Sequence, residues 1–223
     1  MNTRTAKNLA IAVAAYAALS GCTASIVIDK DSPPKASTVR MLEWPLHNFD
    51  LAGTRFTPSD QITPDNVASL KPAWLFQHGV IDGVSNQTTP IIVDGIMYVT
   101  DARGSVYATN ATDGHLLWEY NVSGKLGGGR REGYIFRHRG VVVDDGIVYT
   151  AAGSFIFALD AKTGEPIESF GDGGMASVIL DVLHLKDPSI ETAISVGYWF
   201  TTAPQIHNGM LYIGTTRSES HIA

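Results

Sequence analysis

One sequence pattern occurs twice in this chain, about fifty residues apart. The first copy reads Asp-Gly-Ile-Met-Tyr-Val at residues 94–99 and Ala-Thr-Asn-Ala-Thr-Asp-Gly at residues 108–114. The second reads Asp-Gly-Ile-Val-Tyr-Thr at residues 145–150 and Ala-Leu-Asp-Ala-Lys-Thr-Gly at residues 158–164, and a third begins at residues 208–213. A repeat of roughly 40–50 residues, built from short apolar strands and glycine-centred turns, is typical of the blades of a β-propeller. The repeat therefore predicts an all-β fold.

The two complete copies predict two four-stranded blades and the start of a third. For the first blade we expect strands near residues 88–93, 96–100, 105–109 and 115–121. For the second we expect strands near residues 140–144, 147–151, 155–159 and 165–170, followed by further strands at residues 199–205 and 210–215. Because a propeller needs about four or more blades to close its ring, the pattern predicts a partial β-propeller.

Turn and packing signals accompany the repeat. Asp94-Gly95 and Asp113-Gly114 both fit a tight hairpin turn, since glycine accepts the positive φ that a type I′ turn requires. Trp118 is expected to pack on the neighbouring blade and to donate its indole N–H to that blade's backbone. In the second copy Glu168 stands at the matching position, and we expect Phe170 to replace the indole.

Outside the repeat, three segments carry local signals. Residues 63–67 read Thr-Pro-Asp-Asn-Val, which fits a helix start with a threonine N-cap and proline at the first helical position. Only about one turn can follow before Pro72. Residues 71–76 are expected to form a strand. Residues 175–196 are expected to form a longer excursion between blades, with one short helix.

The first 22 residues predict an export signal. Arg4 and Lys7 form a positive start, and residues 9–19 are uncharged and mostly apolar. This stretch is too short to cross a bilayer, which takes about 20 residues. It ends in Leu-Ser-Gly-Cys, which resembles a bacterial lipobox, and Cys22 is the single cysteine of the chain. We expect Cys22 to carry a lipid anchor; the alternative is a buried N-terminal helix with a chance cysteine.

Three regions follow from this interpretation. They are a lipoprotein signal peptide at residues 1–22, a polar flexible tether at residues 23–40 and an incomplete propeller domain at residues 41–223. The protein is predicted to be periplasmic and bound to the membrane by its lipid, and Thr23 after the cysteine favours the outer membrane over the inner one. The net charge of −6 argues against a nucleic-acid partner, which would require a basic surface.

The stretch before the first repeat adds a further signal. Four short motifs occur there in order: Trp44-Pro45, Asn-Phe-Asp at 48–50, Thr-Arg-Phe at 54–56 and Leu-Lys-Pro-Ala-Trp at 70–74. Together with the repeats, this order resembles the start of the pyrroloquinoline quinone (PQQ)-dependent alcohol and glucose dehydrogenases. The resemblance covers residues 44–223 except about 172–196. It implies an eight-bladed propeller that holds PQQ over its axis, with Ca²⁺ beside the quinone.

The resemblance also implies a reaction. In that family the metal polarises a quinone carbonyl, an aspartate acts as general base on the substrate hydroxyl, and hydride passes to PQQ. The implied partners are a sugar or alcohol substrate and a respiratory electron acceptor. The family's catalytic aspartate, second Ca²⁺ ligand and cofactor-stacking tryptophan are expected beyond Ala223. We therefore assign no catalytic residue in the chain and expect an N-terminal fragment that is inactive by itself.

Four positions match the family's cofactor and metal motifs. Gln87 stands where a glutamate usually contacts the cofactor, and Arg139 where an arginine pairs with a PQQ carboxylate, a pairing that suits a planar guanidinium. Thr201 matches a threonine that contacts the quinone, and Glu219, five residues after Gly214, matches a Ca²⁺ ligand. The structural alternatives are a polar strand-edge glutamine, a surface arginine and a solvated loop acid.

Two functional alternatives stay open at this point. Gly133-Tyr134 stand where many alcohol dehydrogenases of this family have adjacent cysteines, which favours a glucose-dehydrogenase-like or other branch. The repeat and the lipobox also fit another class, a non-catalytic PQQ-repeat lipoprotein that acts as an outer-membrane assembly scaffold. Arg139, Thr201 and Glu219 at family spacing favour the dehydrogenase, because a scaffold needs neither a cofactor-facing arginine nor a metal ligand.

Overall fold

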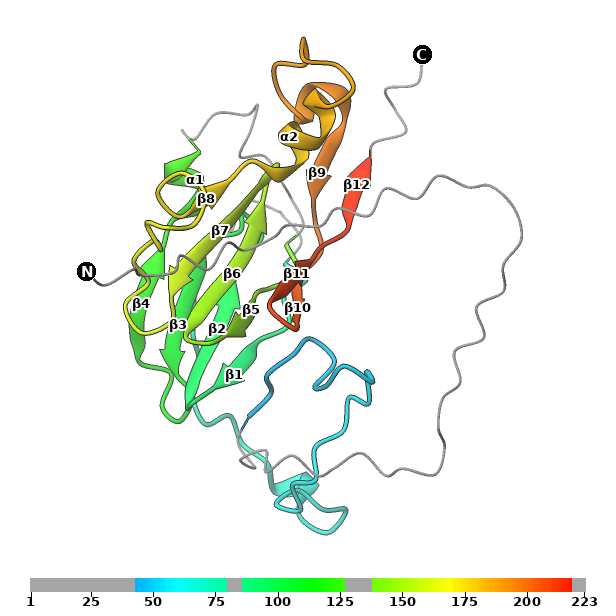
Figure 1. The fold of residues 1–223 in the computed structure, drawn as a ribbon. Helices are drawn as coiled ribbons and strands as arrows, with labels where there is room; N and C mark the ends of the chain where they lie inside the picture. Colours follow the sequence, from blue (N-terminus) through cyan, green and yellow to red (C-terminus); the bar gives the residue numbers. More distant parts are fainter. Residues whose placement is uncertain (1–42, 80–85, 127–137, 218–223) are drawn as a thin grey trace, which may run out of the picture.

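The computed structural model describes residues 43–79, 86–126 and 138–217, and within them two four-stranded antiparallel sheets dominate (Figure 1). The strands of each sheet lie in sequence order, as in a propeller blade. The first blade consists of β1 (Ile91–Val93), β2 (Ile96–Thr100), β3 (Val106–Asn110) and β4 (Leu116–Tyr120). The second consists of β5 (Val142–Asp144), β6 (Ile147–Ala152), β7 (Phe155–Asp160) and β8 (Met175–Ala176). The predicted all-β, partial-propeller fold is confirmed.

The core lies between the two blades, where the inner strands are buried on both faces. β7 buries four successive residues, Ile156 to Leu159, so its sequence is continuously apolar instead of alternating. The cluster that joins the blades contains residues of both sheets: Ile91, Tyr98, Val106, Trp118, Val148 and Leu159. Face-to-face stacking of blades therefore supplies the main hydrophobic burial in the described part of the chain.

The fourth strand of the second blade differs from the prediction. Residues 165–170 were expected to form it, but the strand at this position is β8, at Met175–Ala176. Pro166 forms only an isolated bridge with Leu159, because proline has no N–H to donate to a continuous ladder. The chain turns back after this bridge, and β8 then pairs with the far end of β7.

The third unit consists of two short strand pairs. β9 (Tyr198–Phe200) pairs with β12 (Thr215–Arg217), and β10 (Gln205–His207) pairs with β11 (Met210–Tyr212). The two predicted strands are thus each divided, the first at Pro204, which lacks a donor for pairing.

The excursion before this unit contains α2 (Val178–His184) and the one-turn η2 (Ile194–Val196), so the predicted short helix is confirmed. Ile179 of α2 is buried in one cluster with Ala151 and Phe200, which agrees with the position of α2 beside β9 in Figure 1. None of the helices in the described part of the chain is both long and apolar enough to cross a bilayer.

Of the two local predictions before the first blade, one is wrong. The single helical turn expected from Thr63 is present as the 3-10 turn η1 (Val67–Ser69), which begins later, after Asn66. Asn66 draws the chain into a turn instead, because its side-chain oxygen accepts a hydrogen bond from the backbone N–H of Thr63 at 2.8 Å. Residues 71–76 form no strand, since no described strand pairs with them.

Three hairpin turns have the two successive positive φ values that their Asp-Gly or Asn-Gly sequences favour. Asp94-Gly95 has φ values of 51° and 76°, Asp145-Gly146 has 47° and 74°, and Asn208-Gly209 has 50° and 72°. Two successive positive φ values define the type I′ turn predicted for the first of these pairs. Asp113-Gly114 differs, because only its glycine has a positive φ; Gly114 donates its N–H to the Asn110 carbonyl at 2.8 Å, which makes a longer turn.

Trp118 ties the first blade to the second, as predicted. Its indole nitrogen donates to the Ala161 carbonyl at 3.1 Å, and its ring covers Gly164, where a Cβ atom would lie 2.7 Å from the ring. Trp74 makes the same contacts one unit earlier, with the Ala111 carbonyl at 3.3 Å and with Gly114. Trp74 therefore occupies the position in its unit that Trp118 occupies in the first blade. This equivalence was not predicted from the sequence.

Phe170, which was expected to replace the indole in the second blade, packs against the ring of Tyr149 with 5.9 Å between ring centres. Ile206 and Leu211 of the third unit contact the same buried cluster. The phenyl ring thus contributes apolar contact at this junction but has no N–H to donate.

Candidate functional site

The three strands that lead into the Gly-centred hairpin turns, β1, β5 and β10, lie together, and the residues before them carry the candidate site. β1 contacts β5, and β5 contacts β10. The residues that precede β1 and β5 are also joined, since the N–H of Thr89 donates to the Arg139 carbonyl at 3.4 Å. Gly140 allows this approach, because its φ is +119° and a Cβ atom there would lie 3.1 Å from the Thr89 carbonyl oxygen. Exposed Gln87 stands in the same segment, two residues before Thr89.

Arg139 and Thr201 meet directly, although they are 62 residues apart in the sequence. Nη1 of Arg139 donates to the backbone carbonyl and to the hydroxyl of Thr201, each at 3.0 Å. The Thr201 hydroxyl also lies 2.8 Å from the hydroxyl of Thr216 on β12. Two of the predicted cofactor residues are thus in contact, and the guanidinium is fixed in one orientation by the third unit.

Beneath Arg139 lies a buried polar network centred on His138. Its Nε2 lies 2.6 Å from the carbonyl of Ala151, and its Nδ1 lies 2.9 Å from the Thr100 hydroxyl and 3.2 Å from the N–H of Gly140. A carbonyl only accepts hydrogen bonds, so Nε2 carries the proton and Nδ1 accepts. The Thr100 hydroxyl is in turn 3.0 Å from that of Thr88, which links the Gln87 segment of the first blade to the Arg139 segment of the second.

Burial lowers the pKa of His138 to about 4, and this effect outweighs the opposing effects of the Ala151 carbonyl and of Asp101. The imidazole is therefore neutral at neutral pH and serves as a rigid support for the Arg139 backbone. This role of His138 was not predicted from the sequence. The available signal was the position of His138 directly before the motif arginine.

A small crevice opens on the side of Arg139. It has a volume of about 170 Å³, and its walls consist of five residues: His47, Arg139, Thr202, Ala203 and Gln205. None of the five is acidic, so the guanidinium faces this space without a counter-charge from the wall. A positively charged, hydrogen-bonding crevice of this kind suits an oxygen-bearing anion such as a carboxylate.

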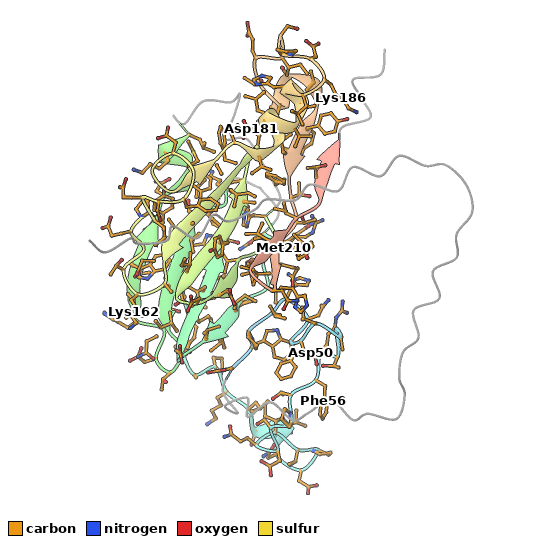
Figure 2. The ribbon with its side chains drawn as sticks, viewed as in Figure 1. Asp50, Phe56, Lys162, Asp181, Lys186 and Met210 are labelled. Atoms are coloured by element: carbon orange, nitrogen blue, oxygen red, sulfur yellow. The ribbon has the colours of Figure 1, made fainter. Side chains whose placement is uncertain are left out.

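The wall opposite the third unit comes from the chain before the first blade. Trp44 exchanges two backbone hydrogen bonds of 3.0 Å with Ile92, and Leu46 packs against the cluster that also contacts Ile206 and Leu211. Figure 2 shows this segment, marked by Asp50, running near the β10–β11 hairpin, marked by Met210. This packing brings His47 into the same crevice as Arg139. In the sequence, the segment around His47 indicated only the family's opening motifs.

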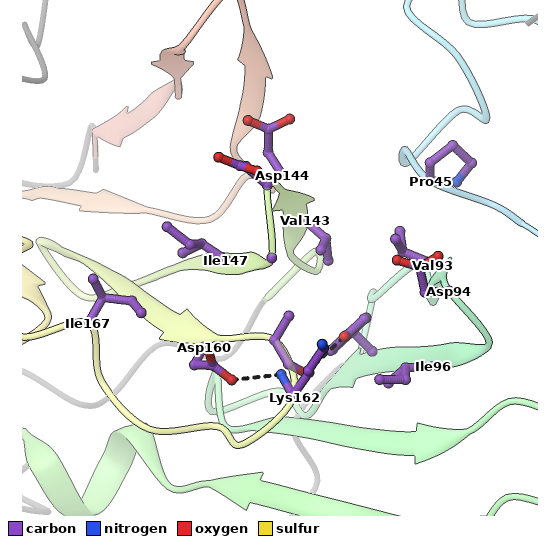
Figure 3. Close-up of a pocket in the computed structure, with 14 residues that line it drawn as sticks. Pro45, Val93, Asp94, Ile96, Val143, Asp144, Ile147, Asp160, Lys162 and Ile167 are labelled. Carbon is purple, nitrogen blue, oxygen red and sulfur yellow. Dashed lines mark hydrogen bonds between the residues drawn. The ribbon is translucent and has the colours of Figure 1, made fainter. Parts of the chain in front are cut away.

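A second and larger crevice, of about 650 Å³, lies between the turns of the two blades (Figure 3). Four aspartates line it: Asp94, Asp144, Asp145 and Asp160. Hydrogen bonds from Thr163 and Lys162 lower the pKa of Asp160, which shows that this carboxylate is used to build its turn. Within the described ranges, no group of three or more acidic, histidine or cysteine side chains could hold a metal ion.

Two predicted site residues cannot be placed. Cys22 and Glu219, as well as Gly133-Tyr134, lie outside the described residues. Their proposed roles as lipid attachment point, Ca²⁺ ligand and branch marker are therefore still predictions.

Stacked blades with an arginine fixed next to β5 define a propeller domain with a candidate anion site. Residues 44–221 match the family described as the β-propeller domain of PQQ-type glucose/ethanol/alcohol dehydrogenases. The chain belongs to this family, and the predicted resemblance is confirmed.

Individual relatives agree with this assignment. The chain is 37% identical over 126 residues to a 1-butanol dehydrogenase (cytochrome c) of Thauera butanivorans, and 34% identical over 134 residues to a quinohemoprotein alcohol dehydrogenase of Comamonas testosteroni. These matches cover 56% and 60% of the chain but only 18% and 19% of the relatives. The crystal structure of quinohemoprotein alcohol dehydrogenase from Comamonas testosteroni superposes with a TM-score of 0.64 at 28% identity, over 82% of this chain and 24% of that one.

Proposed function

We propose that this chain forms the arginine side of the PQQ site in an enzyme that oxidises an alcohol. The observation that carries this proposal is the Arg139 guanidinium, which Thr201 holds in place at 3.0 Å beside a crevice without an acidic wall residue. PQQ carries carboxylates, and a planar guanidinium pairs with a carboxylate through two parallel hydrogen bonds. The residues present therefore fit one carboxylate-bearing edge of the cofactor.

When bound, PQQ would supply the two-electron oxidation, by accepting hydride from the substrate carbon. The residues of this chain bind and orient: Arg139 holds a carboxylate, Thr201 fixes Arg139, and exposed Gln87 lies in the adjoining segment, from which its amide can offer hydrogen bonds. None of them is assigned a proton-transfer role. An alcohol substrate is favoured over a sugar because the relatives named above are alcohol dehydrogenases.

The metal and the electron acceptor belong to the same proposal. Glu219 would supply a carboxylate oxygen to Ca²⁺, a hard cation that prefers such ligands. One relative is named as a cytochrome c-linked dehydrogenase, which supports a respiratory cytochrome as electron acceptor. The proposed location is the periplasm, with Cys22 lipidated and the outer membrane favoured.

The test replaces the first blades of the Comamonas testosteroni enzyme with this chain, so that the remaining blades are present. Isothermal calorimetry then measures PQQ binding with Ca²⁺ present. Arg139→Lys should weaken binding about tenfold or more, because an ammonium cannot reproduce the two-donor pairing. Exposed Arg103→Lys serves as the matched control and should leave the affinity unchanged. Equal affinities for wild type and Arg139→Lys would contradict the proposal.

A further inference from the structure

We propose that His47 is a second contact for the carboxylate that Arg139 binds, through a hydrogen bond from its Nε2. This inference rests on the proposed function, since it assumes that an anionic cofactor edge enters the crevice. It assigns a ligand-binding role to the segment before the first blade.

The position of His47 is fixed by its neighbours on both sides. Trp44 is bridged to Ile92, and the N–H of Phe49 donates to the Leu46 carbonyl at 2.9 Å, which closes a turn around His47. Phe49 also packs against Trp44, with 5.2 Å between ring centres. These contacts fix the backbone at His47, so little further backbone entropy is lost when a ligand binds, which favours affinity.

The hydrogen bonds of the imidazole determine which nitrogen can act. Nδ1 of His47 is buried and has no hydrogen-bond partner. Nε2 is not among the buried atoms without a partner, so it is the nitrogen placed to reach a ligand. A carboxylate only accepts hydrogen bonds, so a bound carboxylate selects the tautomer that carries the proton on Nε2.

The other polar groups in the wall already donate elsewhere. The Thr202 hydroxyl donates to the Gly214 carbonyl at 2.9 Å, and the Gln205 side-chain nitrogen donates to the Pro204 carbonyl at 3.0 Å. Nη1 of Arg139 is used by Thr201. Among the side chains of the wall, this leaves the outer edge of the guanidinium, His47 Nε2 and the second amide hydrogen of Gln205 as donors, and only the first of these carries a fixed positive charge. Arg139 and His47 line the same crevice of about 170 Å³, so we expect one carboxylate that enters it to contact both.

The experiment uses the 223-residue chain at low micromolar concentration, with PQQ as the probe. Binding is followed by quenching of tryptophan fluorescence, and the accessibility of each histidine by diethylpyrocarbonate labelling with peptide mass spectrometry. PQQ in millimolar excess should slow the labelling of His47 at least threefold and leave exposed His115 unchanged. His47→Gln should weaken PQQ binding threefold to tenfold, whereas the matched His115→Gln should not change it. Sodium chloride at equal ionic strength should protect neither histidine.

The outcomes separate the inference from the function on which it rests. If PQQ binds in a manner that Arg139→Lys weakens, but His47 is labelled at an unchanged rate and His47→Gln binds as wild type, the inference is wrong and the proposed function stands. If Arg139→Lys binds PQQ as tightly as wild type in the chimera described above, both are wrong. A second variant, His47→Asn, checked for an unchanged thermal unfolding temperature, prevents misfolding from being taken for lost contact.

Discussion

At the scale of single residues, His138 connects local chemistry to the geometry of the site. Its two ring nitrogens join the Ala151 carbonyl to Thr100 and Gly140, and Gly140 follows Arg139 directly. Protonation of the ring would put a hydrogen on Nδ1, which already accepts a hydrogen bond from the backbone N–H of Gly140. The neutral imidazole is thus a condition for this arrangement, and the stability of the fold should depend on it.

Between about pH 6.5 and pH 4, the stability of the chain should fall. The unfolded state binds a proton at His138 near pH 6.5, but the native state does so only near pH 4, so acid favours unfolding by up to about 3 kcal/mol across this window. Urea unfolding at several pH values measures the slope. His138→Gln should be less stable at pH 7 and should have a shallower slope, while exposed His115→Gln should keep the wild-type slope. Equal slopes in all three proteins would contradict this assignment.

The site residues were only partly predictable. Arg139 and Thr201 could be identified because each stands in a short motif. His47 and His138 could not, since their roles depend on which backbone atoms blade stacking brings near them. His47 lies 92 residues before Arg139 in the sequence, and nothing in its own neighbourhood indicates the partner.

At the scale of elements, the contact between the Trp118 indole and Gly164 predicts a difference in the free energy of unfolding between two glycine variants. Gly164 and Gly146 both have a φ of +74°, but a Cβ atom on Gly164 would lie 2.7 Å from the Trp118 ring, whereas Gly146 faces open space. Gly146→Ala should therefore cost only the left-handed backbone penalty of about 1–2 kcal/mol. Gly164→Ala should cost a further 1–3 kcal/mol because the ring must move. Equal free energies of unfolding for the two variants would contradict the stacking described above.

The strand predictions are correct where local hairpins determine the pairing and wrong where they do not. In the first blade every strand lies where the alternation of apolar runs and Gly turns placed it, because local hairpins alone specify those pairings. The fourth strand of the second blade was misplaced, since Pro166 prevents a ladder that its apolar neighbours would otherwise favour. Residues 71–76 have strand-like composition, yet a strand requires a partner that the sequence pattern does not reveal.

At the scale of the whole molecule, the predicted anchor can be tested apart from the fold. In a Gram-negative host the wild-type protein should sediment with membranes, because a lipoprotein carries several acyl chains and binds stably. Cys22→Ser should move it to the soluble periplasmic fraction, since the hydroxyl replaces the thiol that takes the lipid. Thr23→Ser keeps the cysteine and should remain in the pellet. Continued sedimentation of the Cys22→Ser protein would contradict lipidation at this position.

The hydrogen bonds from Trp74 to the Ala111 carbonyl and from Trp118 to the Ala161 carbonyl also imply an order in which their partners are synthesised. Each indole finds its acceptor further along the chain, 37 and 43 residues later. A ribosome adds roughly 5–20 residues per second, so each tryptophan is synthesised about 2–9 seconds before the carbonyl that its indole needs. A blade therefore cannot finish folding until its successor has been made. The nascent chain should carry one exposed indole at its growing end, where a chaperone could bind, until the next blade covers it.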